Sequence, residues 1–292
     1  MERYILENAV LKVGIKQKGA ELASIVKKET GKEYMWQADP TFWGRHSCIL
    51  FPIIGKLHKG KYNVKGEIYE MGQHGFVRDR LFKLTDEGAD FLKLRYESAE
   101  EDKQLYPFEF AVNIIYRLNF NTLQVIYEIE NHAGETISFA LGGHPAFNCP
   151  LLEGEKRSDY TLRFEKPESA ESHLLNNNGV FEGNTKVVFD GTTDLKITDN
   201  LFDDDALIFK DLQSSKVALV NGEDAAVLTF DFTDFPYLGI WSKNRQSPYV
   251  CIEPWFGIAD NLGGQDDFFV KEGNQTLEAA KTFGCTHKIT VH

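Results

Sequence analysis

The chain has 292 residues, of which 42% are hydrophobic, and it carries a formal net charge of −12. This acidic balance argues against a nucleic-acid or anionic-membrane surface, because either partner needs a basic patch to offset its own negative charge. The first residues show no basic region followed by a long apolar run, so we expect no signal peptide and no membrane span, and we place the protein in the cytoplasm.

Alternating and apolar runs that are typical of β-strands recur along the chain. The first lies between residues 10 and 26, and a hairpin-type turn at 29–32 follows it. Further runs lie at 110–118, 125–129, 187–189, 207–209, 217–219 and 227–231. The best helical segment, 98–105, would form only about two turns before Pro107 ends it. This pattern predicts an all-β sandwich rather than a parallel α/β fold.

No linker and no repeat of fixed period divides the chain, so we expect residues 1–292 to form a single domain. The four cysteines, Cys48, Cys149, Cys251 and Cys285, are far apart and include no C-x-x-C pair. This spacing favours reduced, buried thiols over a disulfide framework or a structural zinc site.

Two stretches in the first third place a charged or ionisable side chain beside a glycine. Lys56 lies in an apolar segment and could donate hydrogen bonds to a polar ligand, although a solvated lysine at a strand end is the simpler interpretation. His74 also has a glycine neighbour and could reach a ligand. Arg78 could bind an anion, although pairing with Asp79 is favoured.

A third stretch, residues 141–149, passes from a strand-like run into two glycines, His144 and a proline. The glycines let the backbone approach a ligand closely and the proline restricts φ, so His144 would face that ligand. A histidine with satisfied hydrogen bonds at a strand end is the competing interpretation.

A fourth stretch, residues 249–257, holds one carboxylate, Glu253, in an apolar strand that ends at Pro254. Such neighbours remove water from the carboxylate and raise its pKa toward the range of a general base, although pairing with an arginine is the plainer alternative. Cys251 shares a strand face with Glu253 and is predicted to be a pocket neighbour. As a nucleophile it would lack an activating partner at a recognisable spacing.

A glutamate base opposite a histidine acid, with aromatic rings nearby and no metal motif, suits proton transfer on a small polyol. Sugars present C–H faces that pack on rings, and hydroxyls that need polar partners. The candidate rings are Phe76, Phe147, Trp241, Trp255 and Phe256, of which we assign Phe147 and Trp255 to substrate binding. We expect a carbohydrate-active β protein whose partner is a small-molecule sugar.

Three motifs in this order resemble the aldose 1-epimerase (galactose mutarotase-like) family: Gln-His-Gly-Phe at 73–76, Gly-His-Pro-Ala-Phe-Asn at 143–148 and Ile-Glu-Pro-Trp at 252–255. The resemblance spans nearly the whole chain and implies a large antiparallel β-supersandwich that interconverts the α and β anomers of an aldose without a cofactor or a metal. It implies that Glu253 removes the proton of the C1 hydroxyl while His144 protonates the ring oxygen. The ring then opens, the aldehyde turns, and closure gives the other anomer.

The resemblance also implies that His74 holds the ring oxygen or neighbouring hydroxyls, and that an aspartate before a later strand binds hydroxyls. That aspartate lies in the run Asp203, Asp204 and Asp205, of which we select Asp205. The run lacks the spacing of a calcium loop, and a solvated acidic turn is the simpler alternative.

Two departures bear on the substrate. Galactose mutarotases place an arginine where this chain has Lys56, and lysine keeps the charge but loses the two-pronged hydrogen bonding. The segment that contains His74 and Arg78 looks like that of the hexose-6-phosphate epimerase branch, in which the arginine helps to bind phosphate. A hexose-6-phosphate 1-epimerase and a non-catalytic sugar-binding protein on the same fold are therefore the alternatives. A hydrolase that uses Glu253 would need a second carboxylate at a defined separation.

Overall fold

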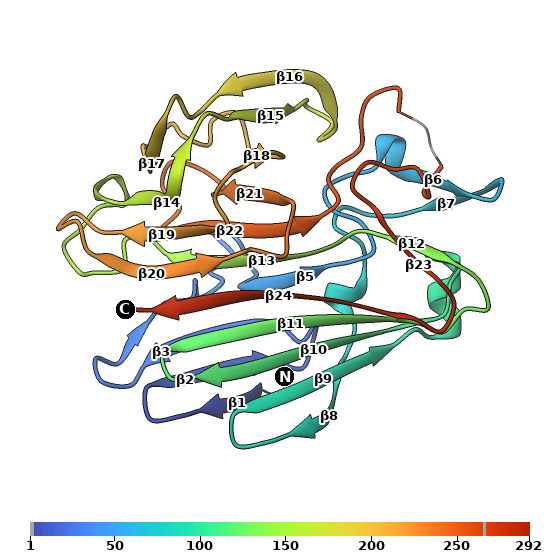
Figure 1. The fold of residues 1–292 in the computed structure, drawn as a ribbon, viewed down its shortest axis with the longest axis horizontal. Coiled ribbons are helices and arrows are strands. Elements are labelled where there is room, and N and C mark those ends of the chain that lie inside the picture. The colour runs from blue at the N-terminus through green and yellow to red at the C-terminus, as the bar shows by residue number, and fades with distance from the viewer. Residues whose placement is uncertain (1–2, 265–266) are drawn as a thin grey trace.

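The computed structural model describes residues 3–264 and 267–292 and confirms the all-β prediction (Figure 1). Within these ranges it contains strands β1 to β24 and four short 3₁₀ helices. The sheets are built from antiparallel neighbours, as in the pairs β10–β11, β11–β24 and β13–β22. In the part of the chain that the structure describes, no helix has the length and apolar character to cross a membrane.

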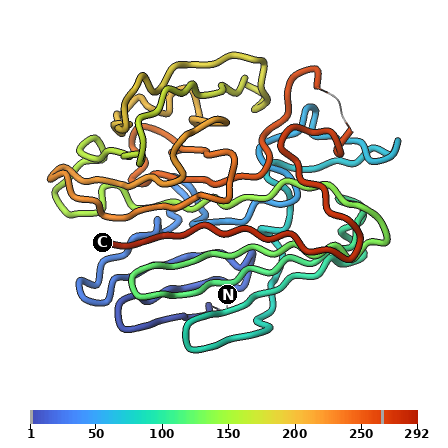
Figure 2. The backbone as a smooth tube through the Cα atoms, viewed as in Figure 1, coloured from blue at the N-terminus to red at the C-terminus, as the bar shows by residue number. Residues whose placement is uncertain are grey.

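The largest sheet has nine strands and runs through the whole molecule (Figure 2). Its order is β17-β14-β19-β20-β24-β11-β10-β9-β8. In β11 every second residue is buried, because alternate side chains of a strand point to opposite faces and only one face meets the core. The strand bounds are β8 Lys83–Glu87, β9 Phe91–Glu97, β10 Phe110–Asn119, β11 Thr122–Asn131, β14 Thr161–Glu168, β17 Thr192–Lys196, β19 Lys216–Val220, β20 Ala226–Asp231 and β24 Thr282–Val291.

A five-stranded sheet packs against this large sheet, in the order β18-β21-β22-β13-β5. Its strands are β5 Ser47–Leu50, β13 Leu141–Asn148, β18 Leu207–Phe209, β21 Tyr237–Trp241 and β22 Tyr249–Phe256. The rings of Phe147 and Phe256 meet Phe230 and Phe283 of the large sheet, with centroids 6.1 and 5.1 Å apart. One face of β13 and β22 is thus held in the core, and the other face is left for a site.

The remaining strands form four smaller sheets. A four-stranded sheet consists of β1 Arg3–Glu7, β2 Leu11–Lys16, β3 Leu22–Lys27 and β4 Lys32–Glu33. Three two-stranded sheets pair β6 Lys61–Val64 with β7 Glu67–Glu70, β12 Ile137–Phe139 with β23 Gln275–Leu277, and β15 Glu171–Leu175 with β16 Phe181–Val187. The 3₁₀ helices are η1 His58–Gly60, η2 Val77–Asp79, η3 Glu100–Gln104 and η4 Arg157–Asp159.

Most of the predicted elements fall where the sequence placed them. The runs at 110–118, 125–129, 207–209, 217–219 and 227–231 coincide with β10, β11, β18, β19 and β20, whereas only the first residue of 187–189 belongs to a strand. The predicted helical segment forms the short helix η3, in which the buried Asp102 carboxylate accepts the Ala99 N–H. The four cysteines are buried and unpaired, as expected.

His287 of β24 is a buried histidine between the two large sheets. Its ring stacks on Phe230 with centroids 5.0 Å apart, and neither ring nitrogen has a hydrogen-bond partner among the described residues. Burial lowers its pKa to about 3, so the folded protein holds this side chain neutral.

We expect His287 to make the free energy of unfolding fall as the pH drops from about 6.5 toward 3. The unfolded chain binds this proton near its ordinary pKa and the folded chain only near 3, so the stabilisation is complete above 6.5 and is lost through that window. One such group contributes a slope of about 1.4 kcal/mol per pH unit. Urea unfolding at several pH values gives the free energy of unfolding as a function of pH. Below pH 6.5 its slope in His287→Leu should be smaller than in the wild type by up to that amount.

The exposed His292 provides the matched control, since His292→Leu removes a histidine that the fold does not bury. If the slope in His287→Leu equals that of the wild type, His287 is not the buried neutral group that makes stability depend on pH.

Candidate active site

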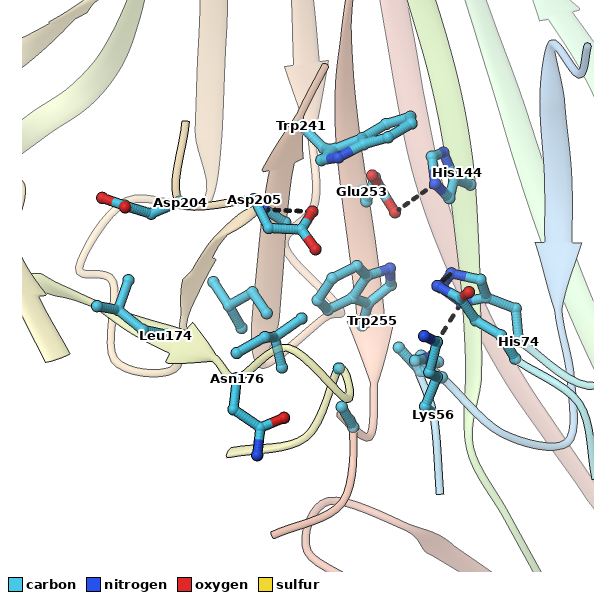
Figure 3. A pocket seen from close by; sticks show the side chains of 18 of the residues that line it. Lys56, His74, His144, Leu174, Asn176, Asp204, Asp205, Trp241, Glu253 and Trp255 are labelled. Carbon is cyan, nitrogen blue, oxygen red and sulfur yellow. Dashed lines mark hydrogen bonds and ion pairs between the residues drawn. The ribbon is translucent and has the colours of Figure 1, made fainter. Parts of the chain in front are cut away.

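A cavity of about 870 Å³ opens on the outer face of the five-stranded sheet (Figure 3). Strands β13, β21 and β22 supply its base, the β15–β16 hairpin supplies one wall, and loops next to β5, η2 and β18 supply the rest. Its volume lies within the range of small-molecule sites. The predicted residues in its lining are Lys56, His74, Arg78, His144, Asp205, Glu253 and Trp255.

His144 and Glu253 lie opposite each other on neighbouring strands at the base of the cavity. The register pairs Gly142 with Trp255 and Ala146 with Cys251, which sets His144 across from Glu253. The His144 Nε2 atom is 3.3 Å from Glu253 Oε2, and both side chains are almost fully buried. The sequence therefore places a potential acid and a potential base in direct contact.

Burial shifts the pKa values of this pair in opposite directions. It raises the pKa of Glu253 well above its usual value, and the nearby Asp205 carboxylate adds to this effect while the Trp255 indole N–H opposes it. Burial lowers the pKa of His144 to about 3. Desolvation disfavours whichever form is charged, so the empty site favours a neutral carboxyl beside a neutral imidazole.

Aromatic rings hold the His144 imidazole in place. The indole of Trp43 stacks on it with centroids 4.5 Å apart at 26°, and Trp241 meets it edge-on at 5.6 Å. His74 meets it edge-on at 5.7 Å. These contacts leave His144 few alternative rotamers.

Hydrogen bonds with Gly55 fix the position and the tautomer of His74. The backbone N–H of His74 donates to the Gly55 carbonyl at 2.9 Å, and the backbone N–H of Gly55 donates to the ring atom Nδ1 of His74 at 3.1 Å. Because Nδ1 accepts a hydrogen bond, the neutral ring carries its proton on Nε2. Burial and the nearby His144 lower the pKa of His74 well below its usual value, so His74 is a neutral donor.

The three consecutive aspartates have different partners. Asp203 pairs with Arg245, with Nε and Oδ1 2.9 Å apart, and Asp204 pairs with Lys186 at 2.8 Å. Asp205 has φ +72° and accepts the N–H of the next residue. Figure 3 shows its carboxylate turned toward Glu253 and Trp255, and that of Asp204 turned away. Of the two aspartates drawn there, Asp205 is therefore the one whose carboxylate faces Glu253.

Arg78 lies where the large cavity meets a second recess of about 360 Å³. Its Nη2 donates to the Gln73 carbonyl at 2.7 Å, and its Nε is 3.9 Å from Asp79 Oδ2, whereas Lys18 binds Asp79 more closely, at 2.8 Å. The recess is lined by four cationic and two acidic side chains, namely Lys16, Lys18, Arg45, Arg78, Glu21 and Asp79. It is therefore a locally positive surface on an acidic protein.

Phe147 does not line the cavity, contrary to the expectation that it contacts substrate. It follows His144 by three residues, and alternation along β13 turns it to the opposite face, where it is fully buried in the core. Phe76 and Phe256 also pack in the core cluster, so the candidate rings that line the cavity are Trp241 and Trp255.

Cys251 is buried beside the pair rather than exposed in the cavity. Its sulfur, the His144 ring nitrogen and a Glu253 oxygen all lie within 4.8 Å of one another, close enough for these three side chains to share a metal ion. Burial raises the pKa of the Cys251 thiol well above its usual value, which disfavours the thiolate that both a metal ligand and a nucleophile need.

Sequence reasoning did not select Trp43 or the asparagines of the β15–β16 hairpin, such as Asn176 and Asn184, although they line the cavity. Trp43 lies four residues before β5 in a stretch rich in aromatic and basic residues, which was a usable signal. The hairpin gave none, because an Asn- and Gly-rich turn is typical of any surface loop.

Comparisons with known proteins agree with this architecture. The aldose 1-epimerase family model matches residues 2–263. The protein LacX (chromosomal) of Lactococcus lactis subsp. lactis is 34% identical in an alignment of 265 residues that covers 88% of this chain and 88% of that protein. A galactose mutarotase-related enzyme from Lactobacillus acidophilus is 34% identical with a TM-score of 0.93, over 100% of this chain and 97% of that one. A galactose mutarotase-like protein from Lactobacillus casei ATCC 334 is 33% identical with a TM-score of 0.93, over both whole chains.

Proposed function

The chain belongs to the aldose 1-epimerase family, and on that premise we propose that it is a mutarotase that interconverts the α and β anomers of an aldohexose. The proposal rests on one observation above all. His144 and Glu253 contact each other at 3.3 Å at the base of a cavity of the right size, so that one bound sugar can meet both groups.

Because burial raises the pKa of Glu253 and lowers that of His144, the empty site favours the arrangement in which the proton of the pair is on Glu253. Sugar hydroxyls that donate to Glu253 stabilise its carboxylate and shift the proton to His144. Glu253 then takes the proton of the C1 hydroxyl, the electrons left on that oxygen form the C1 carbonyl, and the bond from C1 to the ring oxygen breaks. The ring oxygen takes the proton of His144, and the reverse steps close the ring on either face of C1.

The other cavity residues have matching roles in this proposal. His74 donates from Nε2 to the ring oxygen or a neighbouring hydroxyl, Asp205 accepts from hydroxyls, and Lys56 donates to them. The rings of Trp241 and Trp255 cover the C–H faces of the sugar. No step in this sequence needs a cofactor.

A second candidate, a hexose-6-phosphate 1-epimerase, is favoured by the positive recess. Arg45 and Arg78 line both the cavity and the recess, so a sugar in the cavity could extend a phosphate toward these two guanidinium groups. Charge-assisted hydrogen bonds from arginine to phosphate are among the strongest in proteins.

Polarimetry of freshly dissolved α-D-glucose, α-D-galactose and α-D-glucose 6-phosphate tests both candidates. We expect the wild-type protein to speed the approach to anomeric equilibrium for at least one of the three. If the phosphorylated sugar is preferred, Arg78→Gln should lower kcat/KM for it about tenfold more than for glucose, because the lost contacts are to phosphate. No acceleration of any of these sugars would instead favour a non-catalytic sugar-binding protein on the same fold.

A further inference from the structure

The indole of Trp255 is held rigidly across three strands of the five-stranded sheet. A Cβ atom at Gly142 of β13 would lie 2.6 Å from Trp255 Cδ1, and one at Gly239 of β21 would lie 2.4 Å from Trp255 Cη2. A side chain at either position would collide with the ring. The two glycines therefore make the space that Trp255 of β22 fills, with 4% of the residue exposed.

The polar edge of this ring lies near the Glu253 carboxylate, close enough to lower its pKa, but forms no hydrogen bond with it. Trp255 Nε1 is buried and makes no hydrogen bond to any described residue. Figure 3 shows this edge on the cavity side, facing His74 and next to the Glu253 carboxylate. A buried donor without a partner costs free energy, so a donor fixed in this way inside a cavity indicates a ligand atom that accepts from it.

We propose that the Trp255 N–H donates a hydrogen bond to the anomeric oxygen of the bound sugar and stabilises the negative charge that develops there. This inference rests on the proposed function. When Glu253 takes the C1 hydroxyl proton, that oxygen carries the charge until the carbonyl forms and the bond to the ring oxygen breaks. Trp255 neither gains nor loses a proton in the step.

The position and chemistry of the indole suit this role. It lies two residues from Glu253 on the same strand face, so an oxygen within reach of the carboxylate is also within reach of the N–H. A neutral donor that cannot reorient stabilises developing charge without reorganisation during the reaction. Gly142 and Gly239 make the close packing that holds the ring in place. A ring that only packed its face against the sugar would not need to be held so tightly.

A first test observes the hydrogen bond without turnover. In protein labelled with ¹⁵N-tryptophan, the indole signal of Trp255, assigned from Trp255→Phe, should move downfield on titration with D-glucose, D-galactose or D-glucose 6-phosphate. Trp36 is an internal reference, because its N–H already donates to the Trp43 carbonyl at 2.9 Å and should move little. A Trp255 signal that stays in place with all three sugars overturns the proposal.

A second test removes the donor but keeps the shape of the ring. Site-specific replacement of Trp255 by 3-benzothienylalanine puts sulfur in place of the N–H, and we expect kcat to fall about 30-fold while the sugar dissociation constant changes less than about threefold. The same replacement at Trp36, which does not line the cavity, is the matched control and should affect kcat much less. A kcat within about threefold of wild type at position 255, or an equal loss in affinity, overturns the proposal.

These experiments distinguish failure of the proposed mutarotase function from failure of the proposed Trp255 hydrogen bond. If the wild type does not speed mutarotation but the Trp255 signal moves with a sugar, the proposed function is wrong and the hydrogen bond stands. If the wild type is active and the benzothienylalanine protein is equally active, only this inference is wrong.

Discussion

Replacement of Glu253 by glutamine is expected to lower kcat for anomer interconversion by about 10³-fold or more and to leave the dissociation constant for sugar within about threefold. The amide keeps the size of the carboxyl and can still hydrogen-bond to hydroxyls, but it cannot accept the C1 proton. Polarimetry gives kcat, and calorimetric titration of the same preparation gives the dissociation constant.

Glu253→Gln should fold at least as well as the wild type, because burial of Glu253 carries the free-energy cost of protonating its carboxylate, whereas glutamine is already neutral. Thermal unfolding of both proteins separates loss of chemistry from loss of structure. Asp205→Asn is the matched comparison at the cavity wall, where we expect weaker sugar binding and a smaller loss in kcat. Wild-type turnover in Glu253→Gln would show that the base is another group.

Replacement of His144 by alanine should lower kcat by about 10²-fold or more, because the general acid for the ring oxygen is lost. The substitution leaves a space beside the Trp43 ring that matches an imidazole, since that ring stacks on His144 at 4.5 Å. Added imidazole should therefore restore part of the rate in His144→Ala and none in Glu253→Gln.

His287→Leu provides the control for the loss of a buried histidine, because His287 lies in the core and outside the cavity. Its kcat should match that of the wild type. A loss of less than a few-fold in His144→Ala, without rescue by imidazole, would reassign His144 from proton donor to positioning residue.

The sequence alone determined the fold class and singled out the two residues that meet at the base of the cavity. Alternating apolar residues encode strands, and runs such as 110–118 and 125–129 became β10 and β11. His144 and Glu253 stood out because one is the single histidine and the other the single carboxylate in an otherwise largely apolar strand. The same alternation could have placed Phe147 in the core. It lies three positions after His144, and an odd spacing along a strand turns the side chain to the opposite face.

Only the tertiary structure decided which strands pair and which distant side chains meet. The register of β13 on β22 brings His144 within 3.3 Å of Glu253, although 109 positions separate them in the chain. Trp43, the β15–β16 hairpin and the positive recess join the cavity through packing between elements. The physical reason is that local patterns set the conformation of a segment and the face that it buries, whereas its neighbours are chosen by the free energy of the whole core.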